Sequence, residues 1–223
     1  MIIGNGLLAS AFRNSKMNFD DSIIFASGVS NSLEENQEEY DREESLIKQI
    51  ILKNRDLKFI YFSSSSVGLI ENKYYYFKLS MEKLIKDSTS NYIIFRVPQI
   101  VGKSGNSKNL VNFLKNAIIN QEKLTVCQNA IRFLIDVEDL VNVVYYCKDK
   151  QNCKILNFYG IEKTNVIDLC NSIGNILQKK PVLNIVDDKK YETPLLKNSD
   201  IILEAIASIN ISNYTSNVLK KYI

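Results

Sequence analysis

The chain has 223 residues, 45% of them hydrophobic, and a formal net charge of +3 at pH 7. This length is enough to bury one sizeable core, and the mild, interspersed charge is unlike the basic patch of a nucleic-acid-binding protein. The sequence has no histidine, no Cys-x-x-Cys spacing and no apolar run near the length of a membrane span, so we expect no metal site, no membrane segment, and reduced, mostly buried thiols in a cytoplasmic protein.

A very short predicted strand at residues 1–3 runs into a glycine turn and an amphipathic helix. The turn has the pattern Gly-x-Gly-x-x-Ala, made by Gly4, Gly6 and Ala9. Glycine lets the backbone approach a pyrophosphate, whose charge is met by the amides of the following helix. The pattern predicts that Gly4, Gly6, Leu7, Leu8 and Ala9 bind a dinucleotide, although a plain glycine turn between strand and helix would look the same.

The next predicted strand begins at Ser22 and ends in small and polar residues that include Ser27 and Gly28. An acidic segment then opens a helix from about Glu35 to Asn54. In the usual dinucleotide-binding layout, the second strand ends in a charged residue that reads the adenosine ribose. This chain has no obvious place for that residue, so binding of the adenosine part is in doubt.

The third predicted strand, residues 58–62, is an apolar and aromatic run that ends in the serines of residues 63–66. It is typical of a buried parallel strand that presents hydroxyl groups at its carboxyl end, where open α/β sheets bind their ligands. A helix is predicted from about Tyr74 to Asp87. Within it, Tyr74 and Lys78 stand four residues apart and therefore lie on one face.

The pair Tyr74 and Lys78 suits proton transfer. A free phenol has a pKa near 10, and a lysine cation held beside it would lower that pKa, while a serine hydroxyl could share the proton with a substrate alcohol or carbonyl. The alternative is that the Tyr-x-x-x-Lys pattern has no function and arises by chance in a chain rich in both residues. The order of the surrounding elements favours the functional interpretation.

Further predicted elements follow in the second half of the chain. A strand at residues 93–97 leads into Pro98 and Gly102, and Ser107 is predicted to cap a helix from about Asn109 to Asn120. Residues 130–138 form a strand that starts near Arg132, and Asp139 is predicted to cap the helix after it. A strand at 156–160, a helix at 165–177, a strand at 181–186 and a last helical stretch from about residue 199 complete the pattern.

The sequence resembles the extended short-chain dehydrogenase/reductase family in its nucleotide-sugar epimerase, dehydratase and reductase branch. The resemblance rests on the serine-ended strand before Val67, on Tyr74-x-x-x-Lys78 with Glu82 four residues on, and on Arg96-x-Pro98 near a glycine. It also rests on an arginine that starts the 130–138 strand, on Val-x-Asp at its end, and on the Asn and Gly of residues 157–160.

The resemblance implies an α/β fold with a Rossmann-like doubly wound parallel sheet. The strand that begins at Ser22 and ends in small and polar residues looks like the family's fourth strand rather than its second, so two strand-helix units are expected to be missing. Residues 1–160 would form the dinucleotide-binding domain, with 99–130 contributing to the substrate region. Residues 161–223 would form a small C-terminal substrate region.

The family likeness also implies roles for individual residues. Tyr74 and Lys78 would be catalytic, and Lys78 would also hold the nicotinamide ribose of NAD or NADP. The catalytic hydroxyl falls on Ser64 when counted back from Val67 and on Ser65 when counted from the strand; we favour Ser64. Ser65 and Ser66 replace the Asp-Glu pair of the dehydratases, which argues against dehydration.

The remaining implications concern substrate and partners. Arg132 would bind the diphosphate of a nucleotide sugar in forked geometry, unless it forms a strand-end salt bridge to Asp136 or Glu138. Pro98 would line the substrate site, and a homodimer through the helices at about 35–54 and 74–87 is the default.

The sequence therefore predicts an oxidoreductase or epimerase that acts on a nucleotide-activated sugar. Arg13, Ser15 or Lys16 could serve the adenosine end of its cofactor. The alternative is a catalytically inactive nucleotide-sugar-binding or scaffold protein that has lost dinucleotide binding.

Overall fold

The computed structural model describes residues 1–103, 109–187, 197–209 and 211–223. The chain divides into two compact units, each built from three segments. The first unit comprises Met1–Val97, Val137–Tyr159 and Lys197–Ser208. The second unit comprises Pro98–Asp136, Gly160–Leu196 and Ile209–Ile223.

The first unit is built on a parallel sheet of five strands in the order β1-β2-β3-β4-β8. Its strands are β1 (Ile2–Ile3), β2 (Ser22–Phe25), β3 (Lys58–Ser64), β4 (Tyr92–Val97) and β8 (Lys154–Asn157). Its helices are α1 (Leu7–Asn14), α2 (Gln37–Lys53), α3 (Lys73–Ser88), α5 (Val137–Lys148) and α7 (Asp200–Ile206). The central strands are buried on both faces, as their continuous apolar runs predict.

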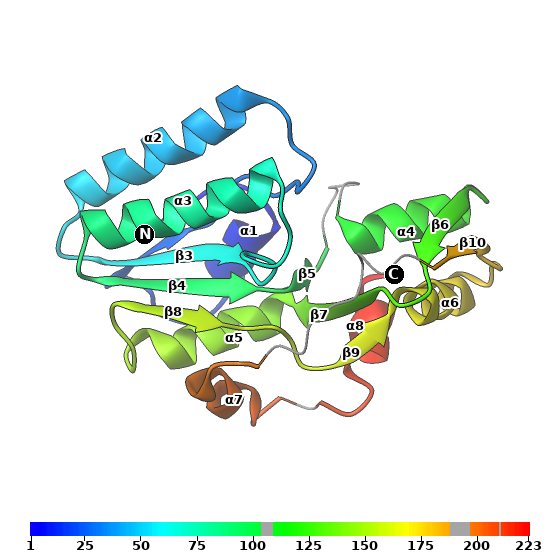
Figure 1. Cartoon of the computed structure of the whole chain (residues 1–223). Coiled ribbons are helices and arrows are strands. Elements are labelled where there is room, and N and C mark those ends of the chain that lie inside the picture. Colours follow the sequence, from blue (N-terminus) through cyan, green and yellow to red (C-terminus); the bar gives the residue numbers. More distant parts are fainter. Residues whose placement is uncertain (104–108, 188–196, 210) are drawn as a thin grey trace. The chain divides into compact units, whose positions relative to one another are not determined.

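Helices cover both faces of this sheet. One core cluster joins Ile47 and Ile51 of α2 and Met81 and Ile85 of α3 to alternate residues of β2, β3 and β4. On the other face, Phe12 of α1 contacts Phe62 of β3, which belongs to the opposite set of alternating side chains. Helix α1 packs against α5. Figure 1 shows α2 and α3 together on one side of the strands and α5 on the other.

Helix α1 lies on an unexpected face of the sheet, given that the first four strands are neighbours in chain order. Strands β1 to β4 follow one another across the sheet, yet α1 lies on the face opposite to α2 and α3. The β1–α1–β2 crossover therefore has the opposite hand to the two that follow, although crossovers of this kind are nearly all right-handed. A doubly wound sheet of order 3-2-1-4-5-6 that lacks its second and third units leaves this arrangement. The predicted Rossmann-like class, with two units missing, is confirmed.

The second unit contains two small sheets and three helices among its described residues. A three-stranded sheet has the order β5-β7-β9, and β6 pairs with β10 in parallel. Its strands are β5 (Gln99–Val101), β6 (Lys123–Cys127), β7 (Ile131–Asp136), β9 (Lys163–Asn165) and β10 (Val182–Val186). Its helices are α4 (Leu110–Ile119), α6 (Val166–Leu177) and α8 (Tyr214–Tyr222).

Two predicted helix caps come out differently. Helix α4 is capped by Asn109, whose side chain accepts a hydrogen bond from the Val111 amide at 3.0 Å; Ser107, the predicted cap, lies outside the described residues. The prediction that Asp139 caps the next helix is wrong, because α5 begins at Val137. Asp139 instead lies in the first turn, where a carboxylate is favoured by the helix dipole.

Two further features bear on the expectations from composition. Cys127, Cys147 and Cys170 are buried free thiols and Cys153 is an exposed one, which agrees with the predicted reduced state. Within the described ranges, no helix combines the length and the apolar character that crossing a membrane requires.

Candidate functional site

Tyr74 and Lys78 lie on the first two turns of α3. The helix begins here because Asn72 caps it, with its side-chain oxygen accepting a hydrogen bond from the Tyr75 amide at 2.9 Å. The four-residue spacing brings the two predicted catalytic side chains together, and the Lys78 ammonium lies 5.6 Å from the centre of the Tyr74 ring. In the described part of the chain, nothing is hydrogen-bonded to the Tyr74 hydroxyl, which leaves it free for a ligand.

The Lys78 ammonium is bound to a carboxylate that the sequence analysis did not single out. Glu43, on α2, lies 2.9 Å from the Lys78 nitrogen through one oxygen and 3.2 Å through the other. The Lys78 side chain is only 2% exposed and that of Glu43 is fully buried. Lys78 also donates to the Tyr61 hydroxyl at 3.1 Å. The lysine is therefore enclosed by protein partners in the structure.

Three donors converge on the Glu43 carboxylate. Besides Lys78, the Tyr61 hydroxyl donates to it at 2.6 Å and the Val29 amide at 2.6 Å. These hydrogen bonds offset the loss of water that burial imposes on the carboxylate. Glu43 and Lys78 thus form a closed, neutral ion pair next to Tyr74.

The environment of Tyr74 raises its pKa instead of lowering it. Burial is the largest cause, and the negative charge of Glu43 is the second, followed by Tyr75 and Tyr40. The expectation that the lysine cation would lower the pKa of this phenol is therefore wrong for this structure. The physical reasons are that burial penalises the phenolate and that the Glu43 carboxylate, which is also paired with Lys78, repels it.

The serines at the end of β3 face different neighbours. The Ser63 hydroxyl is buried and donates to Glu82 of α3 at 2.6 Å, a structural contact. The Ser64 hydroxyl accepts a hydrogen bond from the Ser66 amide at 3.2 Å, and the Ser65 amide donates to the Val97 carbonyl at 2.9 Å. Both candidate hydroxyls, on Ser64 and Ser65, thus stand at the carboxyl edge of the sheet.

The glycine turn after β1 lies beside the end of β2. Gly4 has a φ of +117°, and a Cβ there would stand 2.3 Å from the Ala26 carbonyl oxygen, so the turn needs glycine to pass β2. Gly6 has open space in front of it and leaves the first amides of α1 without a side-chain cap. The Arg13 guanidinium donates back to the Gly4 carbonyl.

These features of the turn fit a pyrophosphate. Free helix amides, open space and a nearby guanidinium are the groups that an anion requires. Leu7, Leu8 and Ala9 form the first turn of α1 behind it. In the described chain the sheet ends at β1 on this side, so no strand corresponds to the one that receives the adenosine ribose.

Ser27 and Gly28 continue the same edge after β2. The Arg42 guanidinium of α2 donates to the Ser27 hydroxyl at 3.1 Å. A Cβ on Gly28 would stand 2.8 Å from the Lys78 nitrogen and 3.0 Å from a Glu43 oxygen. Gly28 therefore makes room for the ion pair, and the structure brings this predicted cofactor residue next to the predicted catalytic lysine.

The predicted substrate residues belong to the second unit. Arg132 lies on β7, is half-buried, and donates to the Ile131 carbonyl at 2.7 Å. Asp136, at the end of that strand, accepts hydrogen bonds from Lys221 at 2.8 Å and from Tyr222 at 2.7 Å. Pro98, directly before β5, is partly buried.

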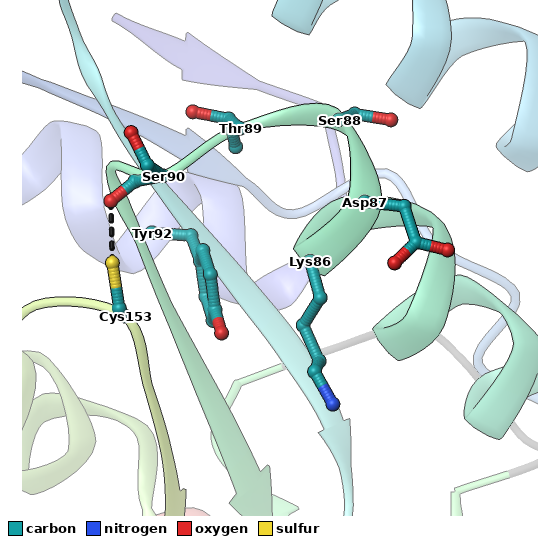
Figure 2. Close-up of a pocket in the computed structure, with 7 residues that line it drawn as sticks. All are labelled: Lys86, Asp87, Ser88, Thr89, Ser90, Tyr92 and Cys153. Carbon is teal, nitrogen blue, oxygen red and sulfur yellow. Dashed lines mark hydrogen bonds between the residues drawn. The ribbon is translucent and has the colours of Figure 1, made fainter.

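A hollow of about 440 Å³ lies elsewhere in the first unit. Figure 2 shows its lining, which comes from the last turn of α3 and from the starts of β4 and β8. Tyr92 opens β4 there, and the Cys153 thiol donates to the Ser90 carbonyl. Because the strands are parallel, this hollow is at the amino edge of the sheet, away from the serines that end β3. It is not the predicted site.

Sequence reasoning missed Glu43, although a signal was present. The buried residues of α2 are Tyr40, Glu43, Ile47 and Ile51, spaced by three and four. A carboxylate in the middle of an apolar stripe must be paired, because an isolated buried charge is very costly.

Comparison with known proteins found no matching family model and no matching curated sequence. Solved structures do match. A dTDP-4-dehydrorhamnose reductase ortholog from Clostridium acetobutylicum has a TM-score of 0.74 at 17% identity, covering 99% of this chain and 96% of that one. A UDP-glucuronic acid 4-epimerase from Bacillus cereus in complex with NAD has a TM-score of 0.69 at 16% identity, covering 98% and 76%.

A third neighbour is the dTDP-4-dehydrorhamnose reductase of Bacillus anthracis in complex with NADP, with a TM-score of 0.70 at 15% identity over 91% of this chain and 79% of that one. The chain therefore has the fold of these reductases and of this epimerase. The expected fold resemblance is confirmed at low sequence identity.

Proposed function

We propose that the chain is an oxidoreductase or epimerase that acts on a nucleotide-activated sugar with NAD or NADP as cofactor. The observation that carries this proposal is the free Tyr74 hydroxyl, which stands one helical turn from Lys78 on the helix after a serine-ended strand. The fold is one whose solved members include such enzymes bound to NAD or NADP.

Each site residue has a role in this proposal. Tyr74 exchanges a proton with the sugar oxygen, and Ser64, or alternatively Ser65, hydrogen-bonds the same oxygen. Lys78 tunes the acidity of the Tyr74 phenol and is the expected contact of the nicotinamide ribose. A bound nicotinamide would supply or accept the hydride. The residues that would hold the cofactor are Gly4, Gly6, Leu7, Leu8, Ala9, Ser27 and Gly28.

On the substrate side, we propose that Arg132 binds the diphosphate of the nucleotide sugar and that Pro98 contacts the sugar. A guanidinium suits this role because its planar fork matches two phosphate oxygens at once. The half-buried position of Arg132 on β7 leaves part of the side chain accessible.

We also propose a cytoplasmic homodimer that associates through α2 and α3. These helices carry large exposed apolar side chains: Leu52 is 64% exposed, Tyr76 57% and Leu79 46%. A second copy that packed against these two helices would cover exposed apolar side chains. Sedimentation of the parent and of a Tyr76→Glu, Leu79→Glu variant tests this, and a parent that sediments as a monomer contradicts it.

The test of the activity is hydride transfer, followed by nicotinamide absorbance. The parent is mixed with NADH or NADPH and a panel of dTDP- and UDP-linked keto sugars, and separately with the oxidised cofactors and the alcohol sugars. Tyr74→Phe should lose about 100-fold or more of the rate. Tyr75→Phe is the matched control and should keep it. A Tyr74→Phe variant as fast as the parent contradicts the mechanism.

The second candidate function is a nucleotide-sugar-binding or scaffold protein without turnover. Two observations favour it: among the described residues the sheet ends at β1 on the adenosine side, and Lys78 is already bound to Glu43. Calorimetry separates the two candidates. Binding of a sugar nucleotide but of neither NADH nor NADPH favours the binding protein, whereas binding of a dinucleotide favours the enzyme.

A further inference from the structure

The buried pair of Glu43 and Lys78 lies at the meeting point of three elements. Glu43 comes from α2, Lys78 from α3 and Tyr61 from β3, and their polar atoms are joined by contacts of 2.6 to 3.2 Å. The Tyr74 ring lies on the same side, 5.6 Å from the Lys78 nitrogen. A carboxylate in this position limits how far the Lys78 cation can stabilise a deprotonated Tyr74.

We propose that Glu43 is a positioning residue that keeps Tyr74 a neutral phenol, so that the site donates a proton and reduces a carbonyl of the sugar. This inference rests on the proposed function and narrows it to reduction. Glu43 acts through Lys78 and through its own charge, and it has no need to touch the substrate.

The charged and titratable groups around Tyr74 support this assignment. From α2 they are Glu43 and Tyr40; from β3, Tyr61; and from α3, Tyr75 and Lys78. The carboxylate is paired with the ammonium, so the cation is not free to stabilise a phenolate. The burial of Tyr74 and the negative charge of Glu43 both raise the pKa of Tyr74. The resting tyrosine therefore carries its proton at neutral pH.

The direction of the chemistry follows from that proton. Reduction of a carbonyl needs a hydride at the carbon and a proton at the oxygen. A reduced nicotinamide is the two-electron donor that supplies the hydride. Tyr74 supplies the proton to the oxygen, and solvent then returns a proton to the phenolate. Oxidation of an alcohol, with which an epimerase starts, needs a phenolate at the outset, and this environment disfavours it.

The substrate class is accordingly a nucleotide-linked keto sugar. The Tyr74 hydroxyl, which has no partner in the described chain, is the donor that a carbonyl oxygen would accept. The Glu43 oxygens are already filled by Lys78, Tyr61 and Val29, so the carboxylate has little capacity to act as a base itself.

The experiment is alkaline titration of tyrosinate absorbance in the Glu43→Gln variant. In the parent, Tyr74 should stay protonated up to the pH at which the protein unfolds, which gives a lower limit for its midpoint. In Glu43→Gln, Tyr74 should titrate in the folded protein at least about 1 pH unit below that limit, because the variant loses a carboxylate and leaves the Lys78 cation unpaired. Subtracting the titration of Glu43→Gln, Tyr74→Phe identifies the phenol. A folded Glu43→Gln protein with an unchanged Tyr74 midpoint overturns the proposal.

Two companion variants keep the test decisive if Glu43→Gln does not fold. Glu43→Gln, Lys78→Met replaces the ion pair by a neutral pair of similar size, and its Tyr74 midpoint should return towards that of the parent. Glu43→Asp shortens the carboxylate and should give an intermediate midpoint. Equal midpoints in parent, Glu43→Asp and the double variant leave no role for Glu43 and contradict the inference.

The kinetic readout separates this inference from the proposed function. If the parent turns over no sugar nucleotide, the proposed function fails while the titration still tests Glu43. If the parent is active, the rise of the alcohol-oxidation rate with pH should move to lower pH in Glu43→Gln, by the amount by which the Tyr74 midpoint falls, with KM for the sugar nucleotide nearly unchanged. A pH profile that stays in place while the midpoint moves overturns the link to reduction.

Discussion

The Arg96 guanidinium donates two hydrogen bonds to the Glu82 carboxylate, one of 2.9 Å from Nε and one of 2.7 Å from a terminal nitrogen. This pair joins α3, which carries Tyr74, to β4. The Glu82 side chain is 2% exposed and that of Arg96 is 20% exposed, and Ser63 donates a third hydrogen bond to the carboxylate. Hydrogen bonding to Glu82 raises the pKa of Arg96 further. The contact fixes the helix that carries Tyr74 to the strand next to the serines.

We expect Glu82→Gln to lower the free energy of unfolding by about 3 kcal/mol, because it leaves the guanidinium partly buried without its charge partner. Urea unfolding followed by circular dichroism measures this. Lys83→Gln, on the exposed side of the same helix, is the control and should change stability by less than about 0.5 kcal/mol. Equal losses in the two variants contradict a structural role for the pair.

Two glycines of the predicted cofactor site should respond differently to alanine. Gly28→Ala should destabilise the protein by about 1 to 3 kcal/mol, because the new methyl group pushes against the Lys78 and Glu43 side chains. Gly6→Ala should not lower stability through a clash, since nothing lies within 4 Å of that methyl position. Its effect should be on dinucleotide binding, measured by fluorescence titration. A Gly6→Ala protein that binds NADH like the parent contradicts a pyrophosphate site at the turn.

Ser64→Ala and Ser65→Ala decide which hydroxyl serves the reaction. We expect Ser64→Ala to lower kcat by about 100-fold and Ser65→Ala to leave it within a few-fold, since a hydroxyl in proton transfer contributes on this scale. Steady-state rates with a keto-sugar nucleotide measure both. The reverse order moves the role to Ser65, and two unaffected variants remove serine from the mechanism.

Stability at alkaline pH should reflect Tyr61. Burial, together with the negative charge of Glu43, raises the pKa of Tyr61 well above its ordinary value. Below a pH of about 10 both folded and unfolded states hold the proton; above it only the unfolded state releases it, so the free energy of unfolding falls as pH rises. Tyr61→Phe should be less stable at neutral pH, by about 1 to 3 kcal/mol for the lost hydrogen bond to Glu43, but should lose less stability between neutral and alkaline pH. Parallel stability curves contradict this account.

The cysteines should differ sharply in reactivity. Burial raises the pKa of Cys147 to about 12 and that of Cys170 to about 11, which makes both poor nucleophiles at neutral pH. Cys153 is exposed. In the native protein, a thiol reagent should modify Cys153 first, and Cys153→Ser should remove this fast phase. Full reaction of all four cysteines should require denaturant; fast modification of Cys147 in the native state contradicts the packing.

The sequence predicts the first unit well because its signals are local. The apolar run of β3 and the spacing of Tyr74 and Lys78 both act within a few residues. The absence of two strand-helix units also followed from the character of the segment after Ser22. The one-directional strand order confirms it.

The electrostatics of the site could not be read from the sequence, because they depend on a residue 35 positions away from Lys78. The expected lowering of the Tyr74 pKa assumed an unpaired lysine. Only the packing of α2 against α3 shows that Glu43 neutralises it. The same holds for α5, whose start at Val137 directly after β7 leaves no room for a cap at Asp139.

Strand β1 is two residues long and, among the described residues, pairs with β2 alone, so its exchange behaviour can report ligand binding. An outermost strand this short should open on its own, so its backbone amides should exchange with deuterium long before those of β3 and β4. An anion bound at the turn around Gly6 would keep β1 paired with β2. We expect slower deuterium uptake at the first residues of the chain to signal occupancy, without any turnover being measured.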